Sequence, residues 1–400
     1  MEKIIEKFDV CIVGGSLAGN YLSYLLSNSK LNIVVIEEHK EIGLPFQCAG
    51  IISKKLSNLI ELPEKIVLNR VKIAKIVSPS GKFIKLSGDE EPYVIDRIAL
   101  DRLFFDKCKN FDNITYLLGE KFKSFKYFKG NHQKLVLIHT NKRKIKAKML
   151  IGCDGPLSSV SKILGRKQKV IYASQIRVRA NFDENEAVMW FNPKWKELFG
   201  WIVPEGNKIY RIGLASSKNL AKNYKLFLEK LDININDKLD QQGGIIPYGV
   251  MKKVSFDNIL LLGDAAGQVK ATTGGGIVML LTAAKYAALC IINCFKNEVF
   301  SKKVIEKYYE KPCLASIGKQ LKIHFFIRIF LENLNADDFD TFFQIIKTSN
   351  IEKIVSLYGD MDFPRELVIR LMKDFVFIKF LVKVVKRNPL ILVNIIKIFF

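Results

Sequence analysis

The sequence predicts an α/β protein with a Rossmann-type domain, an inserted antiparallel β domain and a helical C-terminal region. Three observations support this class: a strand–turn–helix–strand pattern in the first 40 residues, β-like runs between residues 166 and 250, and helical periodicity after Gly276. We expect the first domain to be discontinuous, with residues 1–165 and 250–300 forming it. Residues 166–249 would form the inserted domain and residues 301–400 the helical region.

The N-terminal pattern predicts a βαβ unit with a glycine-rich turn. Residues 8–13 form a short apolar run, a helical pattern continues to Leu26, and a second apolar run over 31–36 ends at Glu37 and Glu38. Between them, residues 14–19 read Gly-Gly-Ser-Leu-Ala-Gly, with a serine at the position of the usual middle glycine. Such a turn lets a pyrophosphate approach the helix N-terminus, and a carboxylate about 20 residues later accepts the ribose hydroxyls. The pattern predicts dinucleotide binding. The alternative for Glu37 and Glu38 is that they are solvent-exposed residues at the end of a strand, without a ligand.

The chain between these parts alternates strand-like segments with one clear helix. Residues 66–95, 114–118, 134–140 and 149–155 have strand patterns, and a helix is expected from Arg97 to about Asn110. A last strand over 259–262 runs into a second glycine-rich turn over residues 263–267, followed by Thr-Gly-Gly-Gly-Ile at 273–277 and a long helix. The carboxylate of Asp264 at this strand end could accept from a ribityl hydroxyl, and the helix start could face a phosphate. An ordinary glycine-rich turn is the alternative.

Composition excludes several classes of protein. Of the 400 residues, 49% are hydrophobic, which is too many for a disordered or collagen-like chain. The seven cysteines form no C-x-x-C pair and only four histidines accompany them, so we expect reduced thiols in an intracellular protein, and no metal site. The net charge of +23 favours an acidic partner such as an anionic membrane or an acidic electron carrier, or it reflects a lysine-rich composition. No motif suggests nucleic acid.

A basic stripe near the C-terminus gives part of this charge a position. In residues 375–387, Lys379, Lys383, Lys386 and Arg387 recur at helical spacing among phenylalanine, valine and leucine. A helix of this kind suits the surface of an anionic bilayer, and Pro389 interrupts it too early for it to span one. The alternative is a helix packed on its own domain or on another subunit, with its lysines outward.

Together the motifs resemble one family of flavoproteins. The N-terminal turn, Cys153-Asp154-Gly155 and the late Gly-Asp-Ala-Ala-Gly resemble the FAD-dependent oxidoreductases of the glutathione-reductase/aromatic-hydroxylase fold, and within them the chain is most similar to the geranylgeranyl reductases. The narrower resemblance rests on three stretches. They are Pro-Phe-Gln-Cys-Ala-Gly at 45–50, Phe-Gly-Trp-Ile-Val-Pro at 199–204 with Gly-Leu-Ala at 213–215, and Gly-Lys-Gln-Leu-Lys at 318–322.

The resemblance assigns expected roles to single residues. It implies that FAD is held at the pyrophosphate, ribose, adenine, ribityl and flavin-ring positions by Gly14, Gly15, Ala18, Gly19, Glu37, Glu38, Cys48, Ala49, Gly50, Arg97, Lys121, Phe122, Asp264, Gly276 and Ile277. Asp154 would serve the cofactor by stabilising its loop, or it would form an ordinary turn with Gly155. It also implies an isoprenoid pocket formed by Phe199, Trp201 and Pro204. The thiol of Cys48 could tune the flavin or donate a proton, or it could simply pack.

We therefore expect an FAD-dependent reductase that saturates C=C bonds of geranylgeranyl chains on archaeal-type membrane ether-lipid precursors. It would work in the cytoplasm, peripheral to the inner face of the cell membrane. Because no second glycine-rich βαβ unit is visible, electrons would come from an acidic donor such as ferredoxin or from transiently bound NAD(P)H. Two rival hypotheses remain at this point: an FAD-dependent monooxygenase or halogenase of a small aromatic substrate, and a non-catalytic flavin-bound or scaffold protein.

Overall fold

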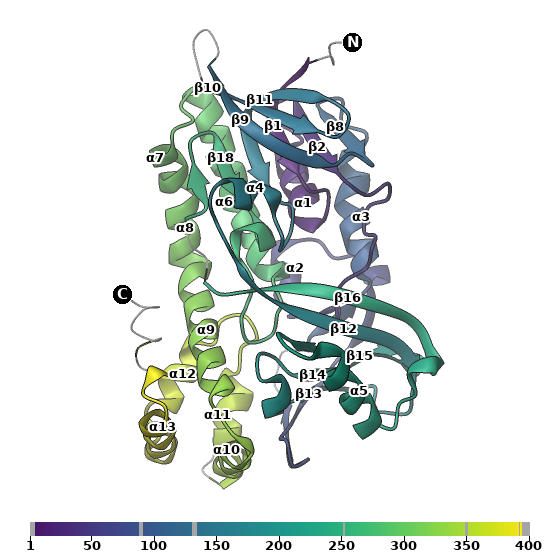
Figure 1. Ribbon diagram of the computed structural model, residues 1–400, viewed down its shortest axis with the longest axis vertical. Coiled ribbons are helices and arrows are strands. Elements are labelled where there is room, and N and C mark those ends of the chain that lie inside the picture. The colour runs from purple at the N-terminus through teal and green to yellow at the C-terminus, as the bar shows by residue number, and fades with distance from the viewer. Residues whose placement is uncertain are drawn as a thin grey trace.

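The computed structural model describes residues 5–87, 91–129, 134–250, 253–348, 351–391 and 393. Within these ranges two large sheets lie at opposite ends of the long axis of the molecule, and α6 (Ile277–Lys296) and α9 (Lys319–Glu332) run along one side between them (Figure 1).

The first sheet confirms the Rossmann-type domain. Its order is β17–β18–β11–β1–β2–β8, and β1 (Ile5–Val13) pairs in parallel with β2 (Ile33–Glu37) and β11 (Lys144–Gly152). Parallel strands need both faces covered, and the apolar run from Val10 to Val13 is buried. On one face α1 (Leu17–Leu26) packs against α3 (Arg97–Cys108) and α6. The remaining strands are β8 (Ile114–Leu118), β9 (Phe122–Lys129), β10 (Lys134–Thr140), β17 (Ser255–Phe256) and β18 (Ile259–Leu261).

The second sheet is larger than the inserted domain predicted from the sequence. Its order is β16–β12–β15–β14–β13–β5–β6, and it is antiparallel except for the parallel pair β5/β13. Strands β5 (Ile73–Val77) and β6 (Phe83–Ser87) precede residue 165, so they join this sheet from within the segment assigned to the first domain. Hydrophobic periodicity identifies a strand and not the sheet that it joins; the predicted boundaries at 165 and 250 remain predictions. The other strands are β12 (Lys169–Arg179), β13 (Glu186–Trp190), β14 (Gly200–Gly206), β15 (Ile209–Ser216) and β16 (Lys238–Tyr248).

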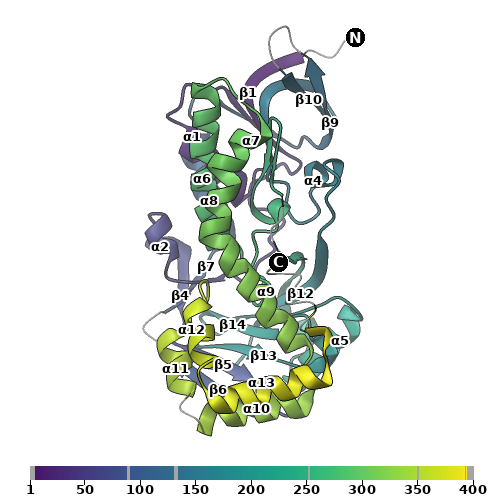
Figure 2. The ribbon, with the colours of Figure 1, turned by 90° about the vertical axis from the view of Figure 1, so that its left-hand side faces the viewer.

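The C-terminal region is helical, as predicted, and it covers the β5/β6 edge of the second sheet. Helices α10 (Ala336–Thr348) and α11 (Ile351–Tyr358) contact β6, and Ile84 joins a shared core with Phe339 and Phe343 of α10 and with Ile351 of α11. Helix α12 (Arg365–Leu371) packs on α11, and α13 (Phe375–Arg387) lies along α10 (Figure 2). A small sheet of β3 (Ile51–Ile52), β7 (Tyr93–Ile95) and β4 (Val67–Arg70) lies between the two large ones.

One helix in the described ranges, α6, is long and apolar enough to cross a membrane by length and composition. Most of its apolar stretch is buried inside the molecule, where Met279, Ala283 and Ala287 belong to the core of the first domain. Its apolar character is therefore explained by packing.

Candidate functional site

One cavity of about 1860 Å³ connects the first sheet, the second sheet and the C-terminal helices. Its wall includes the glycine-rich turn after β1, the segment around Cys48, the aromatic residues of β14 and the chain from Val355 to Leu367. The volume exceeds the roughly 300–1,000 Å³ of a typical small-molecule pocket, so the cavity has room for more than one ligand.

The N-terminal turn needs glycine at two positions because the backbone passes too close for a side chain. Gly14 has a φ of +107°, and a Cβ there would lie 2.3 Å from the carbonyl oxygen of Cys153. A Cβ at Gly19 would lie 2.0 Å from the carbonyl oxygen of Gly14. Gly14, Gly15 and Ala18 line the cavity at the start of α1, whereas Gly19 is not part of its lining. Gly19 was expected beside the pyrophosphate; its position instead allows the helix to pack closely on the strand.

The carboxylate of Glu37 is fixed at the end of β2 beside this turn. Its Oε2 accepts a hydrogen bond from the backbone N–H of Gly15 (2.8 Å), and its Oε1 accepts from the backbone N–H of His39 (2.9 Å). Glu38 instead forms an ion pair with Lys121 at the outer part of the cavity. Only Glu37 is therefore held against the turn itself, in the position from which a carboxylate can accept ribose hydroxyls.

A buried charged cluster lies next to the turn. Arg97, at the first turn of α3, forms an ion pair with Asp101, and the hydroxyl of Ser16 lies 3.4 Å from an oxygen of the same carboxylate. Burial raises the pKa of Asp101, although Arg97 opposes that shift. Sequence reasoning predicted Arg97 and missed Asp101, whose spacing of four residues from Arg97 on a predicted helix was a usable signal.

Asp264 lines the same cavity from the turn after β18. Burial raises its pKa to about 6, while Arg97 acts in the opposite direction. Its side chain borders the cavity. A buried, ionised carboxylate is costly unless it accepts hydrogen bonds, and a ligand hydroxyl group in the cavity could donate one to Asp264.

Asp154 is used within its own loop. Its carboxylate accepts hydrogen bonds from the Ser158 hydroxyl (2.5 Å) and from the Val160 backbone N–H (3.1 Å), which holds the start of the short helix α4 (Ser159–Ile163). This arrangement fits the expectation that Asp154 stabilises the loop, and it leaves the carboxylate oxygens engaged within the protein.

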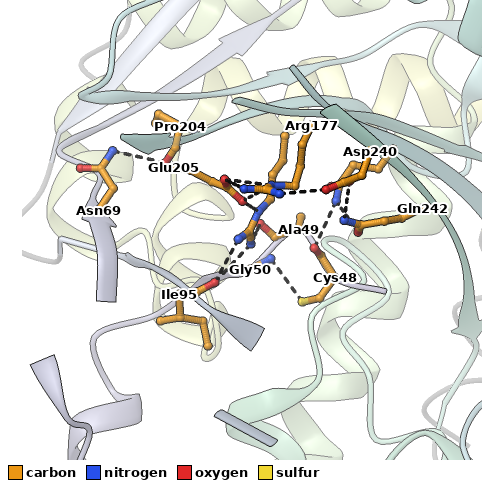
Figure 3. A network of polar contacts seen from close by, with 12 residues as sticks. Cys48, Ala49, Gly50, Asn69, Ile95, Arg177, Pro204, Glu205, Asp240 and Gln242 are labelled. Carbon is orange, nitrogen blue, oxygen red and sulfur yellow. Dashed lines mark hydrogen bonds and ion pairs between the residues drawn. The ribbon is translucent and has the colours of Figure 1, made fainter. Parts of the chain in front are cut away.

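The segment with Cys48 is held from the second sheet by a network of polar contacts (Figure 3). The backbone N–H of Gly50 donates to the sulfur of Cys48 (3.2 Å). The side-chain amide of Gln175 donates to the carbonyl of Cys48 (3.2 Å) and accepts from the indole N–H of Trp201 (2.7 Å). The Cys48 backbone and the aromatic ring of Trp201 are thereby tied to one amide side chain.

An arginine of β15 completes the support of this segment. Arg211 is 2% exposed and donates to the carbonyls of Ala49 (2.9 Å) and Ile95 (3.2 Å). Its charge is balanced by Glu205, which also accepts from Arg177 (2.8 Å). Gly50, with a φ of +76°, makes room for the guanidinium, because a Cβ there would lie 1.8 Å from Nη1 of Arg211.

The predicted isoprenoid residues separate into two groups. Phe199 and Trp201 are both nearly buried and line the cavity, with the Trp201 ring lying over Gly213. Pro204 is not part of the cavity lining; its carbonyl accepts a hydrogen bond from Asn69 (3.2 Å). The structure therefore places two of the three residues where a substrate could touch them.

The C-terminal helices hold the turn before α6. Lys270 donates to Asp362 (2.6 Å) and to the carbonyl of Met361 (3.0 Å), and the buried Arg328 donates to the carbonyls of Ala271 and Thr272. His324 contacts Thr272 through Nδ1 (2.6 Å), and burial together with Lys270 lowers its pKa to about 4.

These charged and polar side chains were not found from the sequence. Lys270, Gly274 and Gly275 line the cavity, whereas Gly276 and Ile277 lie just beyond its lining. The residues of this turn that border the cavity therefore lie before Gly276 and Ile277, the two that the sequence predicted.

The residues of the cavity fit FAD. A glycine cradle at a helix N-terminus suits a pyrophosphate, Glu37 suits a ribose, and Ala49 and Gly50 border a wide space that continues past Asp264. Lys121 and Phe122 also line the outer end, where the adenine was expected. The apolar wall of β14 begins where this polar path ends.

Comparisons with known proteins agree with this arrangement. No protein-family model matches the chain. Digeranylgeranylglycerophospholipid reductase 1 of Methanococcoides burtonii is 26% identical over 369 residues, which cover 87% of this chain and 90% of that protein. A reductase of the same name from Methanosphaera stadtmanae is 28% identical over 76% of this chain and 80% of its own length, and an uncharacterized protein of Methanocaldococcus jannaschii is 26% identical over 92% and 95%.

The solved structures share the fold. A geranylgeranyl bacteriochlorophyll reductase-like protein from Thermoplasma acidophilum superposes with a TM-score of 0.80 at 21% identity, over 97% of this chain and all of that one. The halogenase PltM, in a variant solved with FAD, gives a TM-score of 0.64 at 12% identity over 91% of this chain and 85% of its own. The predicted fold class is confirmed, and it is shared with FAD-dependent enzymes.

Proposed function

We propose that this chain, a member of the geranylgeranyl reductase family, is an FAD-dependent reductase that saturates C=C bonds of geranylgeranyl chains on ether-lipid precursors. One observation carries the proposal. A single cavity joins a dinucleotide cradle at Gly14 and Glu37 to an apolar wall at Phe199 and Trp201. Such a cavity accommodates a flavin and a long apolar chain end to end, which a small aromatic substrate would not require. The names of the related reductases support the choice of substrate.

Reduced FAD, when bound, would supply a hydride for one carbon of the alkene. The turn at Gly14 would hold its pyrophosphate, Glu37 its ribose and Asp264 its ribityl chain. Phe199 and Trp201 exclude water and orient the apolar chain. The other carbon needs a proton, and we assign the thiol of Cys48 as its donor because this group lines the cavity next to Ala49 and Gly50.

The support of Cys48 is part of this mechanism. Gln175 and Arg211 hold the carbonyls of Cys48 and Ala49, so the thiol keeps its place when a flexible lipid enters. Electrons arrive from an acidic protein such as ferredoxin or from transiently bound NAD(P)H. This part of the proposal rests on the lack of a second glycine-rich βαβ motif in the sequence.

The test is a reaction with purified protein reconstituted with FAD and reduced by dithionite. With a digeranylgeranyl ether lipid, each saturated bond should add two mass units to the lipid, read by mass spectrometry. A Cys48→Ala variant should retain bound flavin and lose most turnover, whereas Cys108→Ala, which removes a buried thiol of α3 outside the cavity lining, should keep it. A protein without visible flavin bands, or one that consumes NAD(P)H and oxygen on an aromatic substrate and leaves the lipid unchanged, would overturn the proposal.

A further inference from the structure

The cavity opens to the surface beside helices α11 and α12. Leu357, at the end of α11, lines the cavity and is also 73% exposed, so it marks a mouth. Tyr358, Met361 and Phe363 line the cavity just inside it. The guanidinium of Arg370 on α12 lies 3.6 Å from the centre of the Tyr358 ring and pairs with Glu366, which also lines the cavity.

The next elements along the chain present an unusually apolar surface. Ile369, Met372, Phe375 and Val376 follow one another at the corner between α12 and α13, and all four are exposed. Phe375 is 79% exposed, the most of the four. We call this group the apolar corner. Contiguous apolar patches on a protein surface mark sites that bind a protein, a membrane or a ligand.

Helix α13 adds a basic stripe to the apolar corner. Its inner face, with Phe377, Phe380 and Val384, is buried. Its outer face carries Lys379, Lys383 and Lys386, all exposed, with Phe375 and Val382 on one side of them and Val376 on the other. These observations agree with a helix packed on its own domain with its lysines outward, and they also leave apolar side chains exposed beside those lysines.

The charge of this surface is positive in sum, although Arg387 of α13 is paired with Asp338 of α10. Residues 365–387 contain seven arginines and lysines and two acidic residues, and one of the two, Glu366, is paired with Arg370. The other, Asp374, accepts a hydrogen bond from the Phe377 backbone as the helix cap. Within the described part of the chain, Lys379 and Lys386 form no ion pair. A partner for this surface must be apolar and negatively charged at the same time.

We infer that the apolar corner and the basic stripe dock on an anionic lipid bilayer, with the mouth at Leu357 facing the membrane. An anionic bilayer meets both requirements, since its headgroups attract lysines and its acyl region accepts the exposed apolar side chains. The inference deepens the proposed function, because a lipid substrate could then pass from the bilayer into the cavity without crossing water. Its test below does not depend on the reductase activity.

The first experiment measures cosedimentation of the full-length protein with unilamellar vesicles. Vesicles of phosphatidylglycerol with phosphatidylcholine should bind the protein, and phosphatidylcholine alone should bind it far less. Each lysine near an anionic surface contributes about fivefold in partitioning, so the triple variant Lys379→Gln/Lys383→Gln/Lys386→Gln should lose on the order of 100-fold. High salt should weaken binding of the wild type and change the variant little.

A matched control removes the same charge elsewhere. Lys123, Lys126 and Lys144 are exposed on β9 and β11, at the opposite end of the long axis (Figure 1). Their triple glutamine variant should bind the anionic vesicles within about twofold of the wild type. Equal losses in both triple variants would mean that the overall net charge, and not this surface, drives binding, and the inference would be overturned.

A second experiment tests orientation. Tryptophan placed at Phe375 should be quenched by brominated phosphatidylcholine mixed into anionic vesicles, whereas tryptophan at Phe128 on β9 should not be. Both positions are exposed, so neither change should unfold the protein. Quenching at Phe128 alone, vesicle binding by neither protein, or formation of a dimer through α13 in sedimentation without lipid would each contradict the inference. Failure of lipid reduction with intact vesicle binding would count against the proposed function instead.

Discussion

Replacing Glu205 by glutamine should destabilise the protein more than any other single change in the network around Cys48. Glu205 is the carboxylate partner of Arg211, whose guanidinium is 2% exposed, and it also binds Arg177. Glutamine keeps the shape of the side chain and removes its charge. Arg177 retains Asp240 as a second partner at 2.8 Å, but Arg211 has only the carbonyls of Ala49 and Ile95 left.

The size of the effect follows from burial. Removing one partner of a buried ion pair costs about 3–5 kcal/mol, because the other charge is left uncompensated in a place without water. Replacing Asp240 by asparagine should cost at most about 1 kcal/mol, since its pair with Arg177 is partly exposed to solvent. The two variants touch the same Arg177, so their difference isolates burial as the cause.

Urea unfolding followed by tryptophan fluorescence measures both variants. In addition, the double variant Glu205→Gln/Arg211→Met should recover part of the loss, because it removes the stranded charge together with its partner. If Glu205→Gln and Asp240→Asn were equally mild, or if the double variant were less stable than the sum of its single changes, Arg211 would not depend on Glu205 for its charge balance. The reasoning would then be wrong.

Three further outcomes follow from the site. Replacing Glu37 by alanine should weaken FAD binding by about tenfold or more, because one charge-assisted contact to a ribose is worth roughly 1.5–3 kcal/mol. Flavin fluorescence during reconstitution measures the affinity, and an unchanged affinity would exclude Glu37 from the site. Because burial raises the pKa of Asp264 to about 6 from an ordinary 3.8, its ionisation in the folded protein lowers stability as pH rises between about 4 and 6. Asp264→Asn should therefore gain up to about 3 kcal/mol on the FAD-free wild type at pH 7 and nothing below pH 4, and a pH-independent difference would refute this. Replacing Gly19 by alanine should prevent FAD binding and destabilise the fold, since its Cβ would meet the Gly14 carbonyl; near-native unfolding and flavin content would contradict the close packing.

The parts of the site that lie on short, continuous motifs could be predicted from the sequence. The turn from Gly14 to Gly19, the carboxylate of Glu37 and the turn at Asp264 each lie on a short motif, and the structure brings all three motifs to one cavity. Local spacing predicts such elements because the chain has few ways to connect a strand to a helix through small residues.

The sequence was insufficient where partners lie far apart along the chain. Arg211 holds a carbonyl 162 residues away, and Lys270 pairs with Asp362 at a separation of 92 residues. In the sequence, Glu205 and Arg211 look like ordinary polar positions of a hairpin, because nothing local indicates that they are buried. The same reason explains why periodicity did not show that β5 and β6 join the second sheet: the pairing of strands depends on tertiary packing, and periodicity contains no information about it.

Two of the buried charged contacts lie where one part of the molecule meets another. Arg211 joins the second sheet to the Cys48 segment, and Lys270 with Asp362 joins the turn before α6 to the C-terminal helices. Apolar surfaces alone could pack in several slightly shifted ways, whereas a buried charge is satisfied in one arrangement only. The cavity lies between these parts, so we expect its two ends to keep a fixed relation only while both contacts are intact. Under the proposed function, successive double bonds of a flexible chain must reach the one thiol of Cys48, so the walls need that rigidity and mobility is left to the substrate.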